Sequence, residues 1–136
     1  MKREVRLSSP ETMSKPVGYS HVAEISSGKL VYIAGQVALD RDGRLVGEND
    51  FERQLRQVFS NLDHALKQAG CSFRDVVKLN YFCSDTVDAS SISVVRAVRD
   101  EYVNQDEPPV STFVYVPRLV RPEWLIEVEA VAVAPR

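Results

Sequence analysis

Residues 50–70 read DFERQLRQVFSNLDHALKQAG and predict the helix around which the fold is built. Asp50 suits the N-cap, Gly70 suits the C′ position, and neither Pro nor Gly lies between them. The apolar side chains recur at intervals of three and four residues, which places them on one buried stripe. They are Phe51, Leu55, Val58, Phe59, Leu62, Ala65, Leu66 and Ala69. We therefore expect a helix from Phe51 to Ala69 with one face in the core.

Strand patterns surround this helix, together with one further helix. Asp88 is suited to cap that second helix, whose apolar stripe is Ile92, Val95, Val98 and Tyr102. Ser27-Gly28 reads as a two-residue hairpin turn between the second and third strands. The expected strands cover residues 4–8, 19–26, 29–36, 75–84, 111–116 and 124–134.

The resulting order, β-β-β-α-β-α-β-β, predicts an α+β fold in which one sheet carries both helices on one face. Residues 1–136 have no internal repeat or linker-like stretch, so we expect a single domain. In the last strand, Ile126, Val128 and Ala130 share one side, while Val131 and Val133 keep the other partly apolar. Two helices cover only one face, and an apolar second face predicts an oligomer.

Composition narrows the functional classes. The chain is 44% hydrophobic and 26% charged, and no apolar run approaches the roughly 18 residues of a membrane span. The net charge of −2 argues against a nucleic-acid partner. The basic N-terminus has no apolar segment behind it, so we expect no secretory signal. Cys71 and Cys83 are two thiols without export signals, which favours a cytoplasmic location.

Residue patterns give no sign of a metal or cofactor. The two cysteines are too far apart for a metal knuckle, and the two histidines have no Cys, Asp or Glu at ligand spacing. The sequence also lacks a glycine-rich phosphate loop and a Ser/His/Asp order. We expect neither a metal nor a cofactor.

Several motifs together carry a family resemblance. Gly35-Gln36 follows an apolar strand, Ala69-Gly70 ends the long helix, and residues 75–78 enter a strand. Residues 108–112 read PPVST and residues 126–130 read IEVEA. In this order the motifs resemble the RidA/YjgF family of small enamine/imine deaminases, over about residues 19–133. The resemblance implies a chorismate-mutase-like α+β fold, a trimer built around a barrel of sheets, and small-molecule sites in the clefts between subunits.

The resemblance also implies roles for individual residues. Glu127 matches the glutamate thought to position or activate water, which makes it the candidate catalytic residue. Tyr19 matches a tyrosine that borders the cleft, and Ala34-Gly35 match a small pair whose backbone lines it. Thr112 matches a Cys or Thr that contacts ligand. Ser93 lies where an asparagine is common in the second helix.

Val110 departs from the family pattern. The deaminases have an arginine here that holds the substrate carboxylate by two hydrogen bonds, and an apolar side chain cannot replace that planar group. Arg118 has a family counterpart in an Arg-Leu pair, so Arg121 is the freer candidate to restore the positive charge. Val110 itself then belongs to the floor of the substrate pocket.

Two functional hypotheses follow. In the first, the protein is a hydrolase that deaminates a small imine, enamine or related carbonyl compound, with activity on 2-imino acids in doubt because of Val110. In the second, it is a non-catalytic trimer that binds a small metabolite for regulation. The ribonuclease or translation-inhibitor role attached to some family members has less support, because the chain lacks a basic stripe with exposed aromatic residues.

Overall fold

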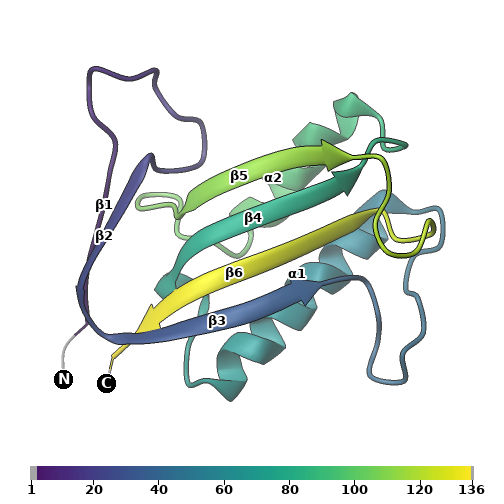
Figure 1. The fold of residues 1–136 in the computed structure, drawn as a ribbon, viewed down its shortest axis with the longest axis horizontal. Helices are drawn as coiled ribbons and strands as arrows, with labels where there is room; N and C mark the ends of the chain where they lie inside the picture. Colours follow the sequence, from purple (N-terminus) through teal and green to yellow (C-terminus); the bar gives the residue numbers. More distant parts are fainter. Residues whose placement is uncertain (1–2, 136) are drawn as a thin grey trace.

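The computed structural model describes residues 3–135, and its elements follow the expected order. Two α-helices, six β-strands and two short 3-10 turns make up the fold (Figure 1). The strands are β1 (Glu4–Ser8), β2 (Val22–Ser27), β3 (Lys29–Gln36), β4 (Val76–Ser84), β5 (Val110–Val116) and β6 (Ile126–Ala134). The helices are α1 (Phe51–Gln68) and α2 (Ile92–Asp100), and the 3-10 turns are η1 (Phe73–Asp75) and η2 (Ala89–Ser91).

The main sheet has four strands in the order β3-β6-β4-β5. β6 runs antiparallel to both of its neighbours, whereas β4 and β5 are parallel because α2 connects them. Both helices lie on one face of this sheet (Figure 1). The α+β fold with two helices on one face is therefore confirmed.

The ends of α1 are set by its capping residues. The Asp50 side chain accepts a hydrogen bond from the backbone N–H of Arg53 at 3.1 Å. At the other end Gly70 adopts φ +72°, and the N–H groups of Gly70 and Cys71 donate to Lys67 and Leu66 carbonyls. The apolar stripe then packs into the core, where Phe59 lies at the centre of an aromatic cluster with Phe73, Tyr81 and Tyr102.

The expected hairpin between the second and third strands is wrong. β2 pairs antiparallel with β1 in a separate two-stranded sheet, and β3 pairs with β6. Gly28, with φ +136°, joins the two sheets, and the β1–β2 ribbon extends away from the main sheet (Figure 1). β3 leaves β2 because the apolar side chains of β6 bury Val31 and Ile33 against the helices, which a local hairpin would not do.

The sheet face without helices, called here the open face, carries both acidic and apolar side chains. Leu30 and Tyr32 on β3 are 55% and 76% exposed, and Val114 on β5 is exposed as well. Glu127 and Glu129 on β6 lie between these two edge strands. Apolar exposure of this kind is typical of a surface that packs against another molecule.

Candidate functional site

Glu127, the candidate catalytic residue, lies on the open face at the start of β6. It is half-buried and stands opposite Phe82 of β4. Burial raises the pKa of the Glu127 carboxyl above its ordinary value, and the negative charge of Glu129 adds to this effect. Glu129 itself accepts a hydrogen bond from the Asn80 amide at 3.1 Å. Glu127 therefore retains its proton to higher pH than an ordinary glutamate.

A β-bulge brings Gly35 to this carboxyl group. Ile33 pairs with Ala130 but Gln36 pairs with Val128, so β3 holds one extra residue between these two pairs. A side chain built at Gly35 would run directly into the Glu127 carboxylate. Glycine at this position lets the acid pack against the backbone, and any larger residue would displace the carboxyl group. The structure thus brings Ala34, Gly35 and Glu127 together, from segments more than ninety residues apart.

The acid also lines a hollow of about 350 Å³ on the open face. Arg118 lies in this hollow, but its Nε and Nη2 donate to the backbone carbonyls of Leu119 and Val120. Arg121 does not enter it, because the Arg121 guanidinium stacks over the Trp124 ring at 5.9 Å in a neighbouring pocket. The remaining lining residues are Phe82, Val116, Leu119, Val120 and Glu129.

The other predicted site residues gather at the opposite edge of the sheet, on and beside β5. Val110 opens β5 across from Lys78, and Thr112 stands exposed across from Asn80. The segment around Ser20 is held beside the start of β5, because the Ser20 N–H donates to the Pro109 carbonyl and the Ser20 hydroxyl donates to the Pro108 carbonyl. Tyr19 therefore lies beside β5, with its ring edge-on to His21.

Ser93 is the most remote of the predicted residues. It is exposed in the first turn of α2, where its hydroxyl donates to the Ser90 carbonyl at 3.0 Å. Two strands, β6 and β4, separate β3 from β5, which places the two edges about 14 Å apart at normal strand spacing. Within one chain, the predicted residues thus form two half-sites: Ala34, Gly35 and Glu127 in one, and Tyr19, Val110 and Thr112 in the other.

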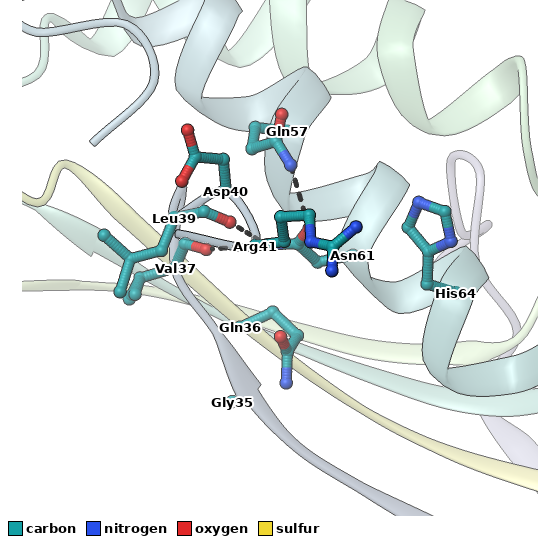
Figure 2. Close-up of a pocket in the computed structure, with 9 residues that line it drawn as sticks. All are labelled: Gly35, Gln36, Val37, Leu39, Asp40, Arg41, Gln57, Asn61 and His64. Atoms are coloured by element: carbon teal, nitrogen blue, oxygen red, sulfur yellow. Dashed lines mark hydrogen bonds between the residues drawn. The ribbon is translucent and has the colours of Figure 1, made fainter. Parts of the chain in front are cut away.

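A larger pocket beside Gly35 was not anticipated from the sequence. It measures about 800 Å³ and lies between α1 and the loop after β3 (Figure 2). The Asn61 side chain points from α1 at this loop and donates to the Val37 and Leu39 backbone carbonyls, while the Gln57 side chain donates to Asn61 Oδ1. These amides hold the loop in place. In the sequence, Gln57 and Asn61 look like ordinary solvent-exposed residues on the polar face of α1, so this role was not predicted.

Neither a metal centre nor a membrane span emerges within residues 3–135. No three His, Cys, Asp or Glu side chains in that range converge as metal ligands. None of the described helices is long and apolar enough to cross a bilayer.

The fold and the acid-bearing hollow define a small α+β protein with a candidate carboxyl site on its open sheet face. A family model described as Endoribonuclease L-PSP matches residues 11–134. A RutC family protein of Synechocystis is 36% identical over 121 residues, which cover 88% of this chain and 89% of that protein. The 3-aminoacrylate deaminase RutC of Acinetobacter baylyi is 31% identical over 132 residues, covering 97% and 98%.

Solved structures agree. The Rid family protein YyfB of Yersinia pestis, described as a protein of unknown function, superposes with a TM-score of 0.84. It is 36% identical, and the match covers 95% of this chain and 98% of that one. The chain belongs to the RidA/YjgF family.

The contact between Gly35 and Glu127 predicts a measurable coupling. We expect Gly35→Ala to lower the free energy of unfolding by about 1–3 kcal/mol, because the added methyl group meets the carboxyl group. In a Glu127→Ala background the same change should cost much less, giving a coupling energy of about 0.5–3 kcal/mol in urea denaturation. An equal cost in both backgrounds would contradict the packing described here.

Proposed function

We propose that this protein is a hydrolytic deaminase that acts on small reactive imines, enamines or related carbonyl compounds in a cleft between subunits. The observation that carries the proposal is the Glu127 carboxyl group, half-buried against Gly35 with a raised pKa. Perturbed carboxyl groups of this kind are typical of general acid–base catalysts. The relative named 3-aminoacrylate deaminase supports the same chemistry, because its named substrate bears an amino group on a carbon–carbon double bond.

The reaction needs one base and one water molecule. Water adds to the C=N carbon, the π electrons move to nitrogen, and the Glu127 carboxylate takes the proton that the water loses. That proton is then delivered to nitrogen. Glu127 then takes the hydroxyl proton of the carbinolamine and passes it to nitrogen, so that the carbonyl forms, the C–N bond breaks and ammonia leaves. An enamine first takes a proton on carbon, which a carboxyl group with raised pKa can supply over a wider pH range.

The cleft itself requires more than one copy of the chain. Gly35 lies on the edge strand β3 and Val110 on the opposite edge strand β5, with Glu127 on β6 between them, and the open face exposes Leu30, Tyr32 and Val114. Packing open faces together in a homotrimer would bury this apolar surface and set the β3 edge of one copy near the β5 edge of the next. We expect the ligand of this cleft to be a small metabolite. We place the protein in the cytoplasm, because Cys71 and Cys83 are both free and buried.

Glu127→Gln tests the catalytic assignment. We expect it to slow keto-acid and ammonia release by about 10²–10⁴-fold, the usual loss when a general base is removed. The substrate is generated with a serine or threonine dehydratase, and release is followed with and without protein. His64→Gln, on the exposed side of α1, serves as the control and should retain full activity. Release that is no faster than without protein would exclude 2-imino acids as substrates.

The pH dependence of the rate gives an independent check. Because the base acts as carboxylate, the rate falls when pH drops through the pKa of Glu127, so the acid limb lies above pH 4.5. Glu129→Gln removes the neighbouring negative charge and should move that limb to lower pH. A limb that stays in place in Glu129→Gln would show that another group titrates.

The oligomeric state is tested by sedimentation equilibrium. We expect a species of three times the 15.3 kDa chain mass. Leu30→Asp should dissociate it, since a carboxylate would be buried without a partner. Met13→Asp, at a comparably exposed apolar residue outside the main sheet, should leave it intact. A wild-type chain that sediments as a monomer would exclude the cleft.

A second candidate function is a non-catalytic trimer that binds a neutral metabolite. It is favoured by Val110, which gives the β5 half-site an apolar floor where the deaminases have an arginine. Thermal stabilisation by neutral compounds but not by 2-ketobutyrate, together with no deaminase activity, would support this alternative.

A further inference from the structure

A second cavity lies behind β5, on the helix-covered face of the sheet. It measures about 320 Å³. Ile92, Val95 and Phe113 form apolar walls, and Arg96 and Arg99 of α2 supply positive charge. Tyr19, Tyr81, Ser111 and Val17 complete the lining.

The Tyr81 hydroxyl is an exception in the core. Tyr81 is only 2% exposed, and its hydroxyl is the one buried side-chain oxygen or nitrogen in the described part of the chain that has no hydrogen-bond partner. Leaving such a group unpaired is costly. Burial raises the pKa of Tyr81 well above its ordinary value, with the charge of Arg99 acting in the opposite direction. The phenol is therefore neutral at physiological pH and can donate a hydrogen bond.

The two arginines differ in their surroundings. The Arg99 side chain is 12% exposed, lies against Gly18, and directs Nε and Nη2 to one Asp100 oxygen at 3.0 and 2.9 Å. This pair is neutral overall. Arg96 is exposed, and no acidic side chain among residues 3–135 pairs with it. The cavity thus carries about one net positive charge.

We propose that this cavity binds a small apolar monocarboxylate, with its carboxylate at Arg96 and Arg99. A monoanion matches the single net charge, whereas a phosphate dianion would leave one negative charge uncompensated. The apolar walls suit a short branched or aromatic carbon chain.

This binding site is separate from the Glu127 hollow. Tyr81 and Phe113 point to the helix-covered face, where their ring centroids lie 5.5 Å apart. Glu127 lies on the open face. The inference therefore does not depend on the proposed deaminase activity. Binding can be measured without any turnover.

The test uses the intact protein and 3-methylbutanoate, with neutral 3-methylbutanamide and inorganic phosphate as comparison ligands. Dissociation constants are measured by NMR titration of the backbone amides, and shifts at Tyr81 and Ser111 locate the site. Arg96→Gln should raise the dissociation constant for the acid about tenfold, the effect of losing one charge-assisted hydrogen bond. Tyr81→Phe should leave the dissociation constant unchanged and should not lower the midpoint of thermal unfolding, because the hydroxyl is inaccessible and has no partner.

Two matched controls isolate the site. Arg53→Gln makes the same charge change on α1, and Tyr32→Phe removes an exposed hydroxyl from the open face. Both should leave the dissociation constant unchanged. Equal binding of the amide, tighter binding of phosphate, or an unchanged constant in Arg96→Gln would each overturn the proposal. Should Tyr81→Phe fail to fold, Arg96→Gln decides alone, because its side chain is exposed.

Discussion

The two-residue alternation along β6 is the constraint on which the rest of the structure depends. β6 pairs with β3 on one side and β4 on the other. Ile126, Val128 and Ala130 are buried against the helices, which turns Glu127 and Glu129 to the open face. A slip of one residue would bury both carboxylates and expose the core residues, so the hydrophobic effect fixes the position of the acids.

The bulge in β3 then converts a surface acid into a perturbed one. Without the extra residue between Ile33 and Gln36, the strand would pair regularly past Glu127. With it, Gly35 packs directly under the carboxyl group and removes part of its hydration. The negative charge of Glu129, two residues along on the same side of β6, raises the pKa of Glu127 further. The elevated pKa thus arises from strand register and backbone packing and needs no dedicated hydrophobic pocket.

Local signals predicted the elements well and the long-range pairing poorly. The caps and apolar stripe of α1, and the bounds of β1, were all evident because they depend on neighbours within a few residues. The β2–β3 hairpin was wrong because Ser27-Gly28 satisfies a local turn rule while β6, a hundred residues away, competes for β3. The assignment of Gly35 and Glu127 to one site came only from family resemblance, and their direct contact was not predicted. The Tyr81 cavity was missed because β4, β5, α2 and the segment at residues 17–19 meet there.

The charges of the two faces bear on the choice of substrate. The hollow on the open face contains two carboxylates and one guanidinium, and the Arg118 Nε and Nη2 groups are already engaged by backbone carbonyls. An anionic substrate entering there would be repelled by Glu127 and Glu129, and Val110 offers no hydrogen bonds to offset that repulsion. A neutral imine is not repelled by these carboxylates. An apolar Val110 in the proposed cleft is therefore compatible with the electrostatics of the open face, where positive charge would be needed only for a substrate that carries its own carboxylate.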